Sequence, residues 1–535
     1  MLVMNTTLHT KNYNAYQPNM LLDFSLSFEK DIAHDDICRT VIEVAEGINV
    51  AKYVDFSNRN SYGYDGVMMF KLLVLAKSLF GYCSTRRLAD LCKTDIRFMF
   101  IAGNQHPSHM AFERFISNDL TMPVEDLFYE VNKYIDSMIT VNTDVFCIDG
   151  TKYEANANKN TFIWRKNTLR NRMKRWKKSI CNINKFLERE NVSLRYSLLK
   201  EPSIDYLLNI SDRLEEYMKD NHIEFVHGKG KRKSEIQKLY DELKENAMKL
   251  WEYSIHLDML GNRNSCSKTD VDATFMHMKY DYYNHTNVFK PGYNIQTGVS
   301  DGFIRNIYIS SDSNDLKTYI PFMEKYKQAY GVLPSKTPAD AGYGSYDNYK
   351  YCKENNIELY MKYSGYYKEK EKTTEKNKFQ TRHLKKDENN NYICPAGHMF
   401  ELEKETIDKR SLYPKVNKKL VNHHCQGCPM KSKCTRSAKG RTITCCEELE
   451  AFHEEVKRNV QSEEGIKLMF QRSNEAEGTF GDLKQNQGYN RLRRRGESGV
   501  KLEIYMIAIG QNIRKYHRRK IENRKKVEKL LLSLN

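Results

Sequence analysis

Between residues 144 and 363 the sequence alternates strand-like and helix-like stretches, and this alternation restricts the fold more than any other feature. "DVFCIDG" (144–150) begins as an apolar strand. "GYNIQTGVS" (292–300) and "FIRNIYIS" (303–310) flank an Asp-Gly pair, which is typical of a β-hairpin turn. Helix-like residues follow at about 315–330, then a short strand into "PADAGYGS", a helix over "YDNYKYCKENN" and a strand "IELYMKY". This order predicts an α/β fold with a mixed sheet.

The chain has 535 residues, which exceeds one typical domain. We expect a helical N-terminal domain at 1–140 and the first part of the α/β core at 141–363. A long, highly charged helical insert at about 162–260 interrupts that core. A polar, cysteine-rich insert follows at 364–446, and residues 447–535 complete the core and end in a basic helix.

The net charge is strongly positive, with 86 Lys and Arg against 69 Asp and Glu, a balance of +17. Because phosphate contacts need Lys and Arg, this balance favours a nucleic-acid partner, although basic proteins that bind no nucleic acid are common. The run "WRKNTLRNRMKRWKK" (164–178) carries eight basic residues and no acid. It is either a DNA-backbone surface or a solvated helix face.

The N-terminal region contains a pair of helices that meet at "GYCS". Ser84 is the expected N-cap of "TRRLADLCK", which starts with Arg86 and Arg87. The pair is either a helix-turn-helix, with these arginines at DNA, or an ordinary corner of a helical bundle. The preceding apolar stretch is broken by Lys71 and Lys77, so a buried helix suits it better than a membrane span.

The start of the chain and the cysteines predict the compartment. Residues 1–20 are mostly polar and have no apolar signal-peptide core. The 13 cysteines show no framework expected of a secreted disulfide protein. We therefore expect a cytoplasmic protein that does not enter a membrane.

Two aspartates stand where strands are predicted to end. Asp149 closes an apolar run and is followed by a glycine, then by Lys152 and Glu154 among small polar residues. A hairpin would explain the Asp-Gly pair alone, whereas a catalytic carboxylate explains more. Asp340 lies where a short strand meets a Gly-rich turn, which is the usual position for ligand chemistry in α/β sheets. The alternative for Asp340 is a loop acid that accepts hydrogen bonds from turn amides.

A third acid, Glu477, lies in "FQRSNEAEGTFGDLKQNQGYNRLRRRG" (470–496). If this stretch is helical, Glu477, Phe480 and Lys484 share one face, which suits a wet cleft better than a core. Gly478 and Gly481 would weaken that helix by about 1 kcal/mol each, so they could equally mark a loop. Taken alone, Glu477 could be a solvated glutamate on a helix.

Three carboxylates from separate elements could hold two Mg²⁺ ions, which need hard oxygen ligands and sit about 3.5–4 Å apart. One ion would activate a water or a 3′-hydroxyl, and the other would stabilise the leaving oxygen of a phosphoryl displacement. The spacing along the chain does not show that the three acids meet.

Several blocks resemble the DDE transposases of bacterial insertion sequences, close to the insertion-sequence 1182 group with its InsH-type N-terminal transposase domain. They are "IDGTKYEANANKNTFIW", "ADAGYGS", "RSNEAEGTFGDLK", "STRRLADLCKTDIRFMFIAGNQHPSHMAFERF" and "RLRRRGESGV". Glu477 and Lys484 have the E-x6-K spacing of that family. The longer family signature has Tyr and Arg where this chain has Phe470 and Ser473, and Arg472 lies five residues before Glu477.

The resemblance implies an RNase H-like catalytic core, which is a mixed sheet flanked by helices. It implies that Asp149, Asp340 and Glu477 bind two Mg²⁺ (or Mn²⁺) ions for DNA strand cleavage and strand transfer. The partners would be terminal inverted repeats, target DNA and a second copy of the chain. Auxiliary contacts to DNA phosphates are expected from Lys484, Arg472, Lys152, Arg86 and Arg87.

Two other functions remain open from the sequence. One is a DNA-binding protein that kept the fold and lost catalysis, and the presence of all three acids argues against it. The other is a nuclease that hydrolyses DNA without strand transfer, which would use the same residues.

The cysteine-rich insert contains "CPAGH" (394–398) and "CQGCPMKSKC" (425–434). A CxxC pair, a third cysteine and a distant fourth predict a tetrahedral structural zinc site, which would stabilise a segment with little apolar core. The alternative is a set of unrelated reduced thiols. The expected ligands are Cys394, Cys425, Cys428 and Cys434, with His398, His423 or His424 as substitutes for one of them.

Overall fold

The computed structural model describes residues 28–54, 63–228, 230–278, 288–369, 371–374, 377–481 and 489–534. Its centre is a sheet in which β5 (Phe289–Ser300) pairs antiparallel with β1 (Cys147–Glu154), with β6 (Phe303–Ser310) and, at its start, with β4 (Thr274–His277). The turn between β5 and β6 is the predicted Asp-Gly hairpin. Asp301 and Gly302 both have positive φ, 51° and 76°, as a type I′ turn requires.

A parallel part continues this sheet beyond β1. β7 (Ala339–Gly344) and β8 (Met361–Tyr363) pair parallel. Lys336, just before β7, forms parallel bridges with Val145 and Glu358, and the Ile148 N–H donates to the Pro338 carbonyl at 3.0 Å. The strands therefore follow the order β6, β5, β1, β7, β8, and the predicted mixed α/β architecture is confirmed.

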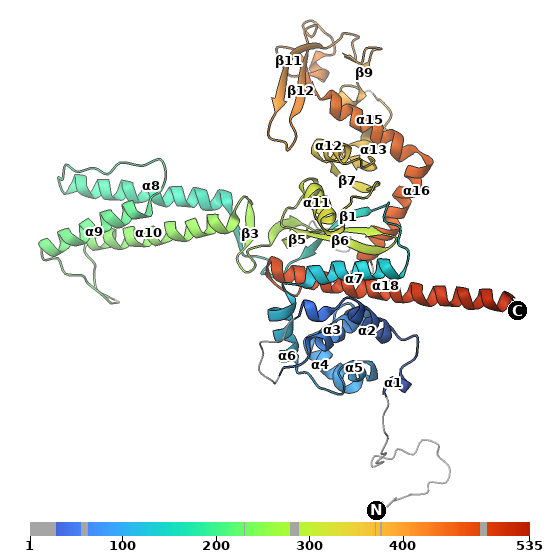
Figure 1. The fold of residues 1–535 in the computed structure, drawn as a ribbon. Coiled ribbons are helices and arrows are strands. Elements are labelled where there is room, and N and C mark those ends of the chain that lie inside the picture. Colours follow the sequence, from blue (N-terminus) through green and yellow to red (C-terminus); the bar gives the residue numbers. More distant parts are fainter. Residues whose placement is uncertain are drawn as a thin grey trace, which may run out of the picture.

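Helices cover both faces of the sheet (Figure 1). On one face, α11 (Tyr319–Tyr330), α12 (Tyr346–Glu354) and α15 (Glu447–Gln461) enclose a core that includes Phe146 and Ile148. On the other face, α7 (Val124–Met138) and the long α18 (Gly496–Leu534) pack against residues of β5 and β6.

The N-terminal helices share this second core instead of forming one of their own. The predicted meeting of two helices at "GYCS" is confirmed, because α3 ends at Phe80, α4 starts at Thr85 and the Ser84 hydroxyl accepts a hydrogen bond from the Arg87 N–H at 3.2 Å. The elements are α1 (Phe28–Asp31), α2 (Ile37–Gly47), η1 (Val50–Lys52), α3 (Gly66–Phe80), α4 (Thr85–Thr94), α5 (Ile96–Ile101), α6 (His109–Arg114) and a π-helical η2 (Phe115–Leu120).

None of the helices in the described ranges is by itself long and apolar enough to cross a membrane. The bent pair α3–α4 meets the test jointly, with 99° between its two helices.

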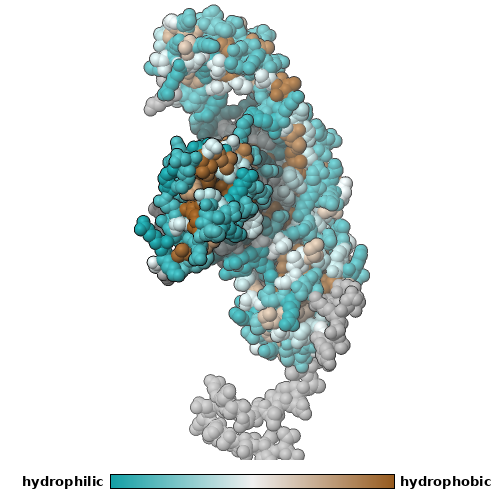
Figure 2. Space-filling model, turned by 90° about the vertical axis from the view of Figure 1, so that its left-hand side faces the viewer, coloured by the Kyte–Doolittle hydropathy of each residue, from teal (hydrophilic) through white to brown (hydrophobic). Residues whose placement is uncertain are grey.

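The charged insert is an arm of three helices that projects from the sheet (Figure 1). It consists of α8 (Arg165–Arg189), α9 (Ile204–Asp220) and α10 (Glu235–Leu260), joined to the sheet region by β2 (Phe162–Trp164) and β3 (Ser265–Ser267). The arm has its own small core around Trp176. Figure 2 looks at the end of the arm and shows a mostly hydrophilic face with scattered apolar patches.

The cysteine-rich insert contains a three-stranded sheet, β11-β12-β13. Seven of the eight residues of β11 are exposed, so this sheet has little core. The elements here are α13 (Tyr366–Glu369), η4 (Thr381–His383), β9 (Lys385–Lys386), β10 (Tyr392–Ile393), β11 (Glu401–Asp408), β12 (Lys415–Asn422), α14 (Lys431–Cys434) and β13 (Arg441–Cys445). The segment that carries Glu477, here called the Glu block (463–481), follows α15. It consists of α16 (Glu463–Arg472), a π-helical η5 (Ser473–Glu477) and α17 (Gly478–Gly481).

Candidate active site

Asp149 and Asp340 lie on neighbouring parallel segments of the central sheet. The bridge between Val145 and Lys336 sets the register, and each aspartate lies four residues beyond its member of that bridge. Paired residues of parallel strands direct their side chains to the same face, so this register brings the two carboxylates side by side. The sheet therefore joins two acids that are almost two hundred residues apart in the chain.

The pKa of Tyr343 is affected by the carboxylates near it. Its ring is fully buried, and burial, followed by the carboxylates of Asp315, Asp149 and Asp340, raises the pKa of its hydroxyl well above the ordinary value. The neutral hydroxyl donates to the Gln296 side-chain oxygen. Three carboxylates thus surround one buried phenol.

Asp315 is an acid that sequence reasoning missed. It starts η3 (Asp315–Lys317), between β6 and α11. An ideal Cβ on Gly342 would lie 2.9 Å from Asp340 Oδ1 and 3.2 Å from Asp315 Oδ2, so the two carboxylates converge on this glycine. Asn294 and Gln296 of β5 donate to Asp315 Oδ1 at 2.7 and 2.9 Å and fix its orientation.

The Glu block lies against β1 through Arg472. The Arg472 Nη1 atom is 3.5 Å from Asp149 Oδ1, and both side chains are largely buried, with 13% and 17% exposure. Arg472 is the last residue of α16, and the π-helical η5 that follows contacts β1 and β5. π-Helical turns are rare in proteins, and those that occur are frequently found at functional sites.

Of the two glutamates in η5, the structure describes the side chain of Glu475. Glu475 Oε2 accepts a hydrogen bond from the Gly302 N–H at 3.1 Å, and its Oε1 accepts one from Gln471 Nε2 at 2.9 Å. Glu475 therefore ties the π-helical turn to the β5–β6 hairpin. Glu477 is the last residue of η5, but its side chain lies outside the described part of the chain, as does Lys484.

The remaining basic candidates are not all near the acids. Lys152 lies on β1, three residues after Asp149 and opposite Asn294 of β5. Arg86 and Arg87 are exposed on the first turn of α4, and the Arg87 guanidinium lies 4.3 Å from the centre of the Phe80 ring. Helices α7 and α18 separate α4 from the sheet (Figure 1), so these two arginines are far from the acids.

The basic run of α8 is partly engaged within the arm. The Trp176 ring is buried and its Nε1 donates to the Leu199 carbonyl at 3.1 Å. Lys178 forms an ion pair with Glu242 at 2.6 Å. This part of the run stabilises the arm, and a role in binding DNA stays a prediction for its other basic residues.

The four cysteines of the predicted zinc site line one small cavity of about 20 Å³. That volume holds about one water-sized particle. The His398 N–H donates to Cys394 Sγ and the Arg441 N–H donates to Cys425 Sγ, both at 3.4 Å. His398 and His424 also line the cavity, whereas His423 does not.

Neither site has a preformed coordination sphere: within the described ranges, no three His, Cys, Asp or Glu side chains are arranged to hold a metal ion. This search includes the four cysteines and Asp149, Asp315 and Asp340, but not the Glu477 side chain. The donor types nevertheless fit, with carboxylate oxygens suited to Mg²⁺ or Mn²⁺ and thiols suited to Zn²⁺.

No sequence pattern indicated that Asp315 and Gln296 would lie at this site. Asp315 follows Asn314, which caps η3, so it looks like an ordinary acid in the first turn of a helix. The only available signal was its place directly after the second hairpin strand, at the entrance to the sheet. Their proximity to Asp340 depends on strand order.

Two family models match the chain. One, described as a transposase DDE domain, matches residues 393–517, and the other, described as a transposase domain (DUF772), matches residues 26–118. No curated protein matches the chain, and no solved structure does. The first match includes Glu477 but begins after both aspartates. The assignment of Asp149 and Asp340 therefore depends on the geometry of the sheet and not on this match. Together the two matches support a DDE transposase.

Proposed function

We propose that this chain is a transposase that binds the terminal inverted repeats of an insertion sequence and catalyses metal-dependent cleavage and transfer of DNA strands. One observation carries the proposal: the parallel register sets Asp149 beside Asp340, and Arg472 of the Glu block contacts Asp149 at 3.5 Å. The two family matches support the same class independently, because neither includes these aspartates.

We propose an RNase H-like organisation for the core. The support is a mixed sheet with three antiparallel strands and two parallel ones, covered by helices on both faces. The acids lie where β1 and β7 run side by side, so their backbones are held by the sheet on which the whole fold depends.

The proposed metal ligands are Asp149, Asp340 and Glu477. A pair of divalent ions, when bound, would activate the attacking hydroxyl and stabilise the leaving oxygen. The chain's own residues prepare the carboxylates: Arg472 contacts Asp149, and Gln296 donates a hydrogen bond to Asp315.

DNA would approach the acids along basic side chains. Lys152 lies three residues after Asp149 on β1, and its role at the reacting phosphate, like that of Lys484, is proposed from the family resemblance. Arg86 and Arg87 are exposed at a helical corner remote from the acids, which suits contact with DNA away from the cleavage site. Two copies of the chain would bring the two element ends together.

The cysteine cavity is proposed as a structural zinc site. A bound Zn²⁺ would link Cys394, on the turn after β10, to Cys425 and Cys428 after β12 and to Cys434 of α14. The N–H groups that point at two of these sulfurs would stabilise thiolates.

The test uses Asp149→Asn and Glu477→Gln proteins with DNA that carries the element ends. We expect both variants to bind this DNA and to lose Mg²⁺- or Mn²⁺-dependent cleavage. Asp144→Asn is the matched control, because Asp144 is an exposed acid five residues before Asp149. If both variants cleave like the unaltered protein, the active-site assignment is wrong. Supplying pre-cut ends and a target plasmid separates strand transfer from simple hydrolysis.

A further inference from the structure

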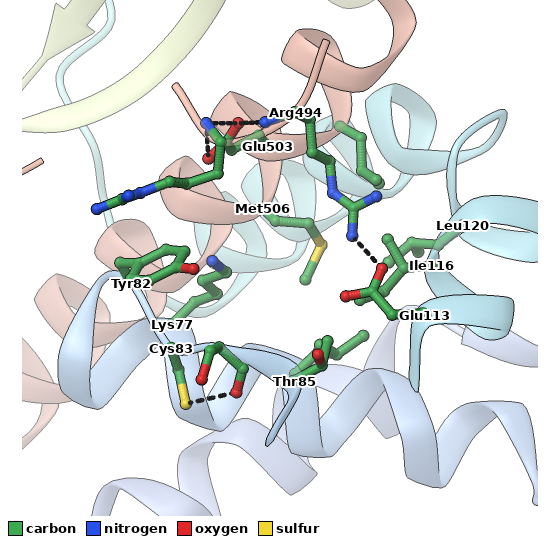
Figure 3. A pocket seen from close by; sticks show the side chains of 14 residues that line it. Lys77, Tyr82, Cys83, Thr85, Glu113, Ile116, Leu120, Arg494, Glu503 and Met506 are labelled. Atoms are coloured by element: carbon green, nitrogen blue, oxygen red, sulfur yellow. Dashed lines mark hydrogen bonds and ion pairs between the residues drawn. The ribbon is translucent and has the colours of Figure 1, made fainter. Parts of the chain in front are cut away.

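A cavity of about 330 Å³ lies between the N-terminal helices and the start of α18, and none of the candidate acids that the structure describes lines it (Figure 3). Its walls come from the α3–α4 corner, from the α6–η2 segment, and from Arg493, Arg494 and the first half of α18. Sites for small ligands occupy about 300–1,000 Å³, so the cavity is large enough for one compact group. None of the roles proposed above uses it.

Two cations in this cavity share one aromatic ring. The Lys77 ammonium is 5.3 Å from the centre of the Tyr82 ring, and the Arg493 guanidinium carbon is 5.1 Å from it. Among the residues that the structure describes, neither side chain forms an ion pair with a carboxylate. Two like charges near one ring leave the cavity with an excess of positive potential.

The two carboxylates that line the cavity are already engaged. Glu503 is 6% exposed and accepts hydrogen bonds from the backbone N–H groups of Arg493 and Arg494 at 3.0–3.1 Å. Glu113 pairs with the Arg494 guanidinium at 3.0 Å. Figure 3 shows Arg494 directed at Glu113 while Lys77 points between Tyr82 and Met506. Neither acid is therefore bound to Lys77 or to the Arg493 guanidinium.

The start of α4 adds further positive potential. Ser84 and Thr85 line the cavity, and the helix that begins at Thr85 is ten residues long. The N-terminus of such a helix carries a partial positive charge and presents backbone N–H groups, an arrangement that binds phosphate in many proteins. Burial lowers the pKa of Lys77, and the Glu503 carboxylate opposes this shift.

We propose that this cavity binds a phosphate group. A phosphate oxyanion would accept hydrogen bonds from Lys77, the Arg493 fork and the first turn of α4, and it would offset the excess charge. The group comes from the backbone of bound DNA, and this part of the inference rests on the proposed function. Arg493 belongs to an arginine-rich loop whose Arg491 and Arg495 contact the chain just after β1, so this loop connects the cavity to the strand that carries Asp149.

The first experiment measures binding of inorganic phosphate to the full chain by isothermal titration calorimetry at constant ionic strength. Lys77→Gln and Arg493→Gln are each expected to weaken binding about tenfold or more, because each removes a charged hydrogen bond. Lys71→Gln and Arg495→Gln are the controls: Lys71 is on the same helix but pairs with Glu46, and Arg495 is in the same loop but outside the cavity.

Arg493 is exposed, so its variant should fold even if the Lys77 variant does not. Phosphate binding that is absent from the unaltered protein, or equal in Arg493→Gln and Arg495→Gln, would overturn the proposal.

The second experiment identifies the source of the phosphate with a salt titration of duplex DNA binding. Each lost phosphate contact should reduce the slope of log K against log[salt] by about 0.9. We expect that reduction in Arg493→Gln and not in Lys71→Gln.

If phosphate binding is lost while the DNA slope is unchanged, the cavity serves free phosphate and the DNA assignment is wrong. A protein that binds phosphate here but never cleaves DNA would contradict the proposed function and leave the cavity assignment intact.

Discussion

The acid cluster and the cysteine cavity are both candidate metal sites, yet the chain builds them in opposite ways. Asp149 is on β1, where Cys147 and Ile148 are fully buried and helices cover both faces of the sheet. The cysteines lie on turns and on α14 beside a small sheet in which one strand, β11, is exposed almost throughout. The first site is held by a large apolar core, and the second has almost none.

This difference indicates a catalytic role for a metal at the acids and a structural role for a metal at the cysteines. One acid beside the first site is oriented without an ion, because Asn294 and Gln296 donate hydrogen bonds to Asp315. The cysteines are joined mainly by turns, so a bound Zn²⁺ would provide cohesion that burial does not. Loss of the metal should therefore impair chemistry at the first site and local structure at the second.

The largest effect is expected at the cysteine cavity. Cys428→Ser should remove bound zinc and unfold the surrounding segment, since structural zinc sites contribute about 10–16 kcal/mol of apparent binding free energy. Metal analysis should fall from about one zinc per chain, and limited proteolysis should cut within residues 394–446.

Cys181→Ser is the control for this variant, because Cys181 is exposed on α8, far from the cavity in the chain. Purified unaltered protein without zinc would remove the distinction between the two sites.

Asp149→Asn should affect chemistry alone. Metal ions supply several kcal/mol of transition-state stabilisation, so loss of a ligand should slow cleavage by about 1,000-fold. The melting temperature should stay close to that of the unaltered protein, because the core around β1 is intact. A variant that unfolds would show that the acid site, like the cysteine site, supports the fold.

Asp315→Asn tests whether the acid that the sequence did not reveal belongs to the same site. It would keep the hydrogen-bonding shape beside Asp340 and lose a charge, which should slow cleavage by about 10–100-fold, the usual effect of a group next to the metal ligands. Asp312→Asn, at an exposed acid three residues earlier, should not change the rate. Equal rates for both variants would limit the site to the three predicted acids.

The smallest effect is a pH dependence at the junction of the two regions. His453 of α15 stacks on Tyr363 with ring centres 3.6 Å apart, and burial lowers its pKa from 6.5 to about 4. Between these two pH values His453 binds a proton in the unfolded chain but not in the folded one. The free energy of unfolding should therefore fall by about 1–2 kcal/mol as the pH drops from 6.5 toward 4.

His453→Gln should make denaturant unfolding less dependent on pH over this range. An unchanged slope of stability against pH would show that His453 titrates normally in the folded protein.

Features that depend on neighbouring residues were predictable from the sequence. The Asp301-Gly302 turn, the Ser84 cap and the alternation of strands and helices follow from backbone preferences and short-range periodicity. The same local signals singled out Asp149 and Asp340, because each ends an apolar run beside a small residue.

Only the tertiary structure decided which of these residues meet. The register between β1 and the segment before β7 brings Asp149 beside Asp340, and strand order brings Asp315 to the same place. The cavity that joins Lys77 to Arg493 likewise forms between elements more than four hundred residues apart. Such contacts arise from the packing of whole elements, whose energies are summed over many buried side chains, and no short stretch of sequence encodes them.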